Sequence, residues 1–175
     1  MRPDAFTLVE LLVVIAVIGI LATLAVPSMA SAGERARSTA CQSNLRQMGL
    51  LLRVYLDENG NRFPTLQNRG RDTNEVDLRT ADSVLTPRGP TQLWKCPSDR
   101  KNLFQETGSS YFWNNLLNGQ AADRIRLLGI PMQEAGFPVI SDKSGFHARL
   151  GPGRAANHLY SDGAVKQFFV LKPNP

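Results

Sequence analysis

The hydrophobic pattern is dominated by one apolar run at residues 6–26, in which Glu10 is the only charged residue and after which Pro27 follows. A helix of about 20 apolar residues, at about 1.5 Å rise per residue, matches the thickness of the hydrocarbon core of a bilayer. The rest of the chain has the composition of an ordinary water-soluble domain. We therefore expect residues 6–27 to form a transmembrane helix that holds one small domain outside the membrane.

The helical pattern continues beyond Pro27, so this proline predicts a kink and not the end of the helix. Apolar residues then recur at alternating spacings of four and three, which places them on one helix face. These residues are Cys41, Leu45, Met48, Leu52 and Tyr55. Gly60 suits a left-handed helix cap, so one helix of about 78 Å is predicted from residue 6 to about residue 57. The apolar stripe needs a covering layer, most simply a small sheet.

The remainder of the chain contains shorter signals. Residues 61–92 are weakly patterned and predict a surface excursion with one short element near residues 75–84. Aromatic and β-branched residues predict strand pieces and tight turns at residues 93–99, 109–115 and 137–142. The strongest signal is Asp162-Gly163 between two apolar segments, because a two-residue hairpin turn needs positive φ at both central positions. The predicted fold class is α+β, with a long N-terminal helix against a small antiparallel sheet.

Glu10 is the most informative residue of the apolar run. A carboxylate in the hydrocarbon core costs roughly 2.5 to 3.5 kcal/mol, and no Lys, Arg or His lies within one helical turn of it. Either Glu10 reaches the headgroup layer and is tolerated there, or it has a specific partner. A secretory signal peptide with a small-residue site at residues 30–32 is a third interpretation, but the length of the run and its acidic residue argue against it.

Residues 6–22 resemble the processing and assembly signature of type IV prepilins and pseudopilins, in which a polar leader precedes a Phe, a Glu and an apolar helix. The resemblance implies that a prepilin peptidase cleaves between Ala5 and Phe6 and that the new Phe6 amine is methylated. It also implies that the apolar helices assemble into a filament. There Glu10 would pair with the N-terminal amine of a neighbouring subunit and set the register. Ala5 stands where the family usually has Gly.

Shorter pieces extend the resemblance along the chain. Residues 41–47, 96–99 and 157–165 look like one branch of prepilin-like proteins, whose C-terminal motif is a His, nine residues and Asp-Gly. Asp162 and Gly163 supply the Asp-Gly pair, but Pro152 stands in the place of the His. The implied organisation is a leader at residues 1–5, a transmembrane and assembly helix at 6–27, a helix continuing into the globular domain at 28–60, and an extracytoplasmic α+β domain at 61–175.

The chain has two cysteines, Cys41 and Cys96. If the domain is extracytoplasmic, one disulfide is favoured over two free thiols. It would close a loop of about 55 residues and contribute roughly 4 kcal/mol in the chain-entropy model. A metal or redox role is the least favoured alternative, because structural zinc takes four ligands and two cysteines supply only two.

Charge and motifs bear on the remaining function classes. The formal net charge of +5 comes from scattered basic residues, which favours a solvated surface over a nucleic-acid site. No nucleophile elbow or phosphate-binding glycine loop indicates an enzyme, so we expect no catalytic residue and no cofactor. Asp142 and Asp162, with His147 and His158 near them in sequence, are weak candidates for a metal site such as calcium. They lack the alternating carboxylates of a calcium loop.

The sequence thus predicts a pilin-like structural subunit of a type II secretion pseudopilus or a type IV pilus-like filament. We expect it in the inner membrane as a single-pass protein with an extracytoplasmic, periplasmic domain. Its expected partners are other pilin or pseudopilin subunits, the prepilin peptidase and N-methyltransferase, the inner-membrane assembly platform and membrane lipid. The alternatives are a minor tip pilin that binds DNA or a surface, and a membrane-anchored or secreted domain that forms no polymer.

Overall fold

The computed structural model describes residues 7–70, 78–87, 91–132, 136–143 and 145–169, apart from the side chains of residues 24–28, 30 and 91. Helix α1 (Leu8–Glu58) is its longest element, with 51 residues. The helix begins with a capping box, in which the Thr7 hydroxyl accepts from the Glu10 N–H and the Glu10 carboxylate accepts from the Thr7 N–H. It ends at Asn59, and Gly60 follows with φ +62°. The predicted single long helix is confirmed, with both described ends within two residues of the prediction.

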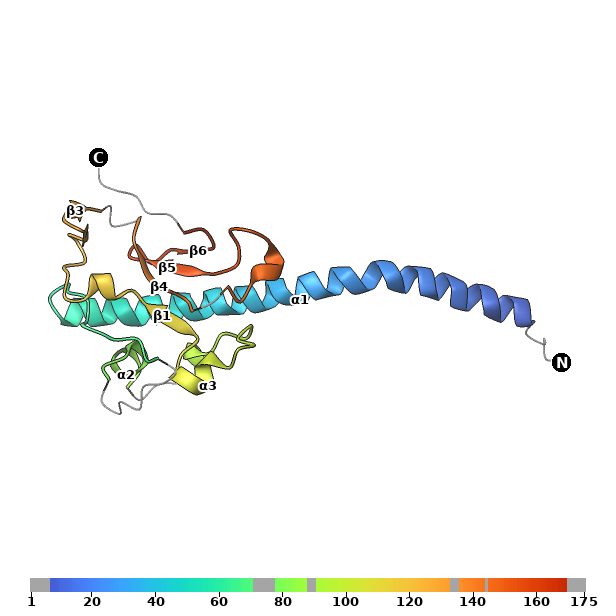
Figure 1. Ribbon diagram of the computed structural model, residues 1–175, viewed down its shortest axis with the longest axis horizontal. Coiled ribbons are helices and arrows are strands. Elements are labelled where there is room, and N and C mark those ends of the chain that lie inside the picture. The colour runs from blue at the N-terminus through green and yellow to red at the C-terminus, as the bar shows by residue number, and fades with distance from the viewer. Residues whose placement is uncertain (1–6, 71–77, 88–90, 133–135, 144, 170–175) are drawn as a thin grey trace.

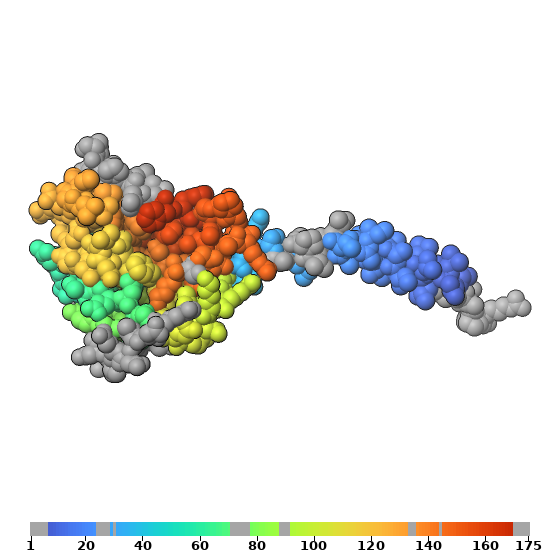
Figure 2. All heavy atoms as spheres, viewed as in Figure 1, coloured from blue at the N-terminus to red at the C-terminus, as the bar shows by residue number. Residues whose placement is uncertain are grey.

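The globular part of the molecule surrounds the C-terminal half of α1, while the N-terminal half projects away from it (Figure 1, Figure 2). This division follows the side chains that α1 buries, which recur at spacings of three and four on one face. They are Glu34, Ser38, Cys41, Leu45, Met48, Leu52 and Leu56. Four of the five stripe residues predicted from sequence are buried, whereas Tyr55 is only partly buried and Leu56 takes the final core position.

A four-stranded antiparallel sheet has the order β1-β4-β5-β6. Its strands are β1 (Tyr111–Trp113), β4 (Pro138–Asp142), β5 (His158–Tyr160) and β6 (Val165–Lys166). Both β5 and β6 contact α1, and at one point the approach is close. A Cβ atom added at Gly49 of α1 would lie 3.0 Å from the Leu159 side chain. The sheet and the long helix together confirm the α+β fold class.

Smaller elements complete the domain. They are α2 (Ala81–Leu85), η1 (Thr91–Trp94), α3 (Leu103–Thr107), η2 (Asn115–Leu117), η4 (Ala148–Leu150), and a separate pair of strands, β2 (Arg126–Leu127) and β3 (Ile130–Pro131). The predicted element near residues 75–84 corresponds to α2, although residues 75–77 lie outside the described residues.

Two local predictions are corrected by the structure. The stretch at residues 93–99 forms the end of η1 and a turn instead of a strand piece, so that the buried Trp94 indole donates to the Thr86 hydroxyl. The hairpin turn at Asp162-Gly163 is one residue longer than predicted, because Tyr160 N–H donates to Ala164 O. Only Gly163 has positive φ (+81°), while the Asp162 carboxylate accepts from the Ala164 N–H and braces the turn. Such a three-residue loop with a left-handed glycine is a common alternative to the two-residue turn.

Candidate functional site

The N-terminal half of α1 exposes an apolar surface that no other described part of the chain covers. Its large residues between positions 8 and 21 are 46–78% exposed. They are Leu8, Val9, Leu11, Leu12, Val13, Val14, Ile15, Val17, Ile18, Ile20 and Leu21. An apolar surface of this extent needs lipid or other helices as its environment.

Glu10 is the only charged residue of this surface. Its carboxylate accepts hydrogen bonds from the N–H and the hydroxyl of Thr7, both at 2.8 Å. Among the described residues no cation forms a salt bridge with it. Ala5 and Phe6, the residues that the prepilin resemblance places on either side of the cleavage point, lie outside the described residues.

Where side chains are described, the structure contains no helix that is both long enough and apolar enough to cross a membrane. The single-pass topology of residues 6–27 therefore stays a prediction.

A disulfide joins Cys41 of α1 to Cys96, which follows η1. The two Cα atoms are 5.2 Å apart, and both residues are completely buried. The bond therefore ties the loop after η1 to the buried face of the long helix.

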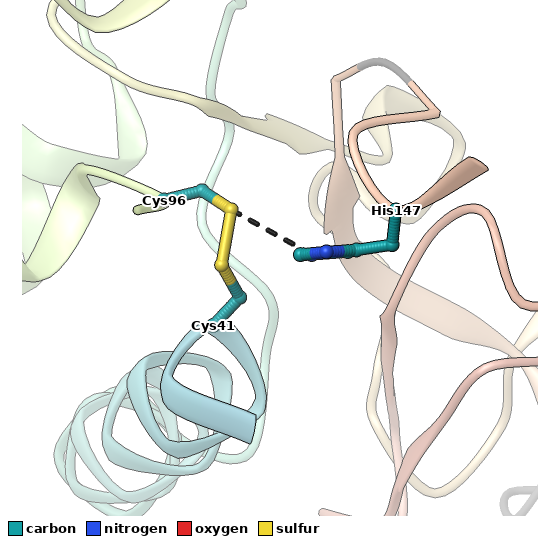
Figure 3. A group of neighbouring side chains, drawn as sticks. All are labelled: Cys41, Cys96 and His147. Carbon is teal, nitrogen blue, oxygen red and sulfur yellow. Dashed lines mark hydrogen bonds between the residues drawn. A yellow bond between two sulfur atoms is a disulfide. The ribbon is translucent and has the colours of Figure 1, made fainter. Parts of the chain in front are cut away.

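His147 lies against this disulfide (Figure 3). Its imidazole Nε2 is 3.7 Å from Cys96 Sγ, and its side chain is fully buried. The residue precedes η4, which packs on α1. Sequence reasoning noted His147 only as a weak metal candidate, because nothing local indicates that it faces a disulfide formed by residues far away in the chain.

Glu34 holds the other side of the imidazole. Its Oε1 lies 2.8 Å from His147 Nδ1 and accepts from the Ser98 hydroxyl at 2.6 Å, while its Oε2 accepts from the Arg37 guanidinium at 2.8 Å. Burial of the carboxylate raises its pKa, but the hydrogen bonds from Ser98, Arg37 and His147 outweigh burial and lower the pKa to about 2. The ionised carboxylate therefore accepts a hydrogen bond from Nδ1–H and fixes the orientation of the ring.

Asp142 approaches the imidazole from strand β4. Its Oδ2 is 3.5 Å from His147 Nε2 and accepts from the N–H and the side-chain amide of Asn157, at 2.7 and 3.1 Å. Its Oδ1 is buried and has no hydrogen-bond partner among the residues that the structure describes. Burial raises the pKa of Asp142 to about 7, despite the hydrogen bonds from Asn157.

These contacts form one buried polar cluster, consisting of Glu34, Ser98, Asp142, His147 and Asn157 beside the disulfide. Its members are buried, so a substrate would have no access, and the cluster positions chain segments relative to α1. Sequence reasoning missed Glu34, Ser98 and Asn157. Glu34 did carry a signal, because it continues the spacing of the α1 stripe backward from Cys41 by seven residues.

Of the weak metal candidates, the structure brings Asp142 and His147 together, with Oδ2 3.5 Å from Nε2, but it does not add Asp162 or His158 to them. Among the described His, Cys, Asp and Glu residues, the group close enough to share an ion is Cys41, Cys96 and His147, whose ligand atoms lie within 4.8 Å of one another. Asp162 sits at the exposed hairpin tip, 4.0 Å from Lys166 Nζ. His158 lies on β5, where its Nδ1 is 2.7 Å from the Ser141 hydroxyl.

Comparison with known proteins gives one match. Residues 2–26 match the family model described as the prokaryotic N-terminal methylation motif, which is consistent with a type IV prepilin-like protein. No curated protein and no solved structure matches the chain. The resemblance deduced from Phe6 and Glu10 is thus confirmed for the N-terminal segment, while the resemblance to the branch with the His and Asp-Gly motif stays a prediction.

Proposed function

We propose that the chain is a pilin-like structural subunit that assembles through the N-terminal part of α1 into a type II secretion pseudopilus or a type IV pilus-like filament. The observation that carries the proposal is one continuous helix with two different surfaces. The described side chains of its N-terminal half are exposed, and Glu10 is the one charged residue in its apolar run. Its C-terminal half packs in the core of a folded domain. The methylation motif matches the exposed half.

Processing would begin at the N-terminus. A prepilin peptidase would cleave between Ala5 and Phe6 and methylate the Phe6 amine. Glu10 would then be the fifth residue of the mature chain, one helical turn from the new amine. In a bundle of such helices the amine of one subunit is a partner for the Glu10 carboxylate of the next. An unpaired charge in that apolar environment is costly, so the pair favours one register.

The location follows from the same surface. Residues 6–27 would insert in the inner membrane before assembly, and the domain built around the C-terminal half of α1 would lie outside the cytoplasm. Other pilin or pseudopilin subunits, the processing enzyme and the membrane assembly platform are the partners that this cycle requires. The domain would then cover the outside of the filament.

Intact-mass and N-terminal analysis of the protein from native membranes tests the proposal. We expect a mature chain that starts at Phe6 with one added methyl group. Retention of Met1, or cleavage after Ala32 as for a secretory signal peptide, would contradict it. The protein would in that case be an anchored or secreted domain that forms no filament.

A further inference from the structure

A third potential metal ligand, His147, lies beside the two sulfurs of the Cys41–Cys96 disulfide. The two sulfurs and His147 Nε2 all lie within 4.8 Å of one another, and the three residues are completely buried. Figure 3 shows the imidazole ring edge directed at the sulfur of Cys96. Thiolate and imidazole are the ligands that zinc prefers in proteins.

Two of the distances between these ligand atoms match those of a tetrahedral zinc site. With Zn–S near 2.3 Å and Zn–N near 2.05 Å, a sulfur and a nitrogen ligand are about 3.6 Å apart, and a nitrogen and an oxygen ligand about 3.4 Å apart. The observed separations are 3.7 Å between Cys96 Sγ and His147 Nε2, and 3.5 Å between His147 Nε2 and Asp142 Oδ2. The two sulfurs would have to separate to about 3.8 Å. Asp142 would have to move toward them, because it lies outside the group whose ligand atoms are all within 4.8 Å of one another.

Glu34 supplies the support that zinc-bound histidines usually have. A metal-ligating imidazole almost always donates its other N–H to a carboxylate or carbonyl, which fixes the tautomer. Here Glu34 Oε1 lies 2.8 Å from His147 Nδ1, so Nδ1 carries the proton and the lone pair of Nε2 points toward the sulfurs. In the oxidised protein that lone pair faces the Cys96 sulfur, which has no proton to donate, and the carboxyl group of Asp142.

Asp142 is the candidate fourth ligand, and its side chain is fully buried. Oδ2, the oxygen near His147, already accepts from Asn157, whereas Oδ1 has no hydrogen-bond partner among the described residues. A buried carboxylate oxygen without a donor is costly, and a bound cation would satisfy it.

We propose that the dithiol form of this protein binds one Zn²⁺ through Cys41, Cys96, His147 and Asp142, so that a metal replaces the disulfide as the link between α1 and the loop after η1. A dithiol reductant donates two electrons and two protons, the S–S bond breaks, and the reductant becomes a disulfide. Zn²⁺ then forms two Zn–S bonds as both thiol protons leave to solvent, and accepts the Nε2 lone pair. The inference is independent of filament assembly, because it concerns only the globular part.

Zinc titration of the full-length chain in detergent micelles tests the proposal. One sample is reduced with a trialkylphosphine, which is oxidised to the phosphine oxide, and the other sample keeps the disulfide. We expect one Zn²⁺ per reduced chain and none per oxidised chain. Co²⁺ in place of Zn²⁺ should give the absorption bands of a tetrahedral site with thiolate ligands. If the reduced chain binds no Zn²⁺, the proposal is wrong, whether or not the reduced chain is folded.

Matched variants separate this site from adventitious binding. In the reduced protein, His147→Gln should weaken Zn²⁺ binding by more than about 100-fold, and Glu34→Gln, which loosens the ring orientation, by about 10- to 100-fold. His158→Gln, which alters the other histidine of the chain, should leave the affinity unchanged. Equal affinity in the His147 and His158 variants would contradict the assignment, and circular dichroism of each variant shows whether it is folded.

Discussion

His147 Nδ1 and Glu34 Oε1 lie 2.8 Å apart although 113 residues separate them in the sequence. The contact joins the loop before η4 to the buried face of α1, and Ser98 and Arg37 bind the same carboxylate. The Glu34 carboxylate therefore binds side chains from the loop before η4, from the loop after η1 and from α1 itself. This anchor lies beside the disulfide that fastens the loop after η1 to the same helix.

Replacing Glu34 should destabilise the domain strongly. Glu34→Ala leaves a buried imidazole and a buried hydroxyl without their acceptor, and each buried polar group left unsatisfied typically costs about 1–3 kcal/mol. We expect a clear fall in the thermal midpoint of the full chain in detergent. Glu58→Ala, at the exposed end of the same helix, is the control and should change the midpoint little. Similar midpoints for the two variants would show that the cluster contributes nothing.

Removing the disulfide should also cost stability. The bond closes a loop with a sequence separation of 55, for which the chain-entropy model gives roughly 4 kcal/mol. We expect the Cys41→Ser/Cys96→Ser double variant to unfold at a lower denaturant concentration than the oxidised wild type. The companion measurement alkylates the free thiols of protein that has not been reduced and then determines its mass. Two alkylated cysteines in protein from native membranes would show that the bond does not form there.

Asp99 should make stability depend on acid pH. Burial of its carboxylate raises the pKa, but hydrogen bonds from the Ser110 hydroxyl and from the N–H groups of Phe104, Leu103 and Lys101 lower it below the usual value. A group whose pKa is lower in the folded state contributes stability above its unfolded pKa, near 4, and that contribution is lost as the pH falls further.

The matched variant for this prediction is Asp99→Asn. It should be less stable than wild type by about 1 kcal/mol at neutral pH, because the amide offers a single acceptor oxygen for donors that now bind two. The difference should shrink as the pH is lowered from 5 to 3. Asp57→Asn, on the exposed surface of α1, should show no such convergence. A pH-independent difference for the Asp99 variant would mean that the charge is irrelevant.

Glu10 should matter for assembly through its charge. Gln at this position can still accept from the Thr7 N–H, so Glu10→Gln keeps the capping box and removes only the charge. We expect normal cleavage before Phe6 but at least about tenfold less subunit in sheared filaments, since losing one strong interaction of 1.4 kcal/mol already gives that factor. Glu58→Gln is the control on the same helix. Wild-type filament yield from the Glu10 variant would refute the proposed charge pair.

Local patterns in the sequence were sufficient for several features of this protein. The spacing of Cys41, Leu45, Met48 and Leu52 identified the buried face of α1, because a helix repeats its faces every three to four residues. The composition of the Asp162-Gly163 segment identified the hairpin, and Phe6 with Glu10 identified the methylation motif, since both signals lie within a few neighbouring residues. The fold class followed from these elements.

Tertiary structure decided what depends on residues that are distant in sequence. The turn at Gly163 is longer than its dipeptide suggests, because the register of β5 and β6 sets the loop length. Residues 93–99 could not pair as a strand once Trp94 entered the core as part of η1. The cluster of Glu34, Asp142 and His147 beside the disulfide has no sequence signature as a unit. A single sequence encodes local propensity and periodicity, but contacts across 113 positions exist only after α1, β4 and the loop before η4 have packed together.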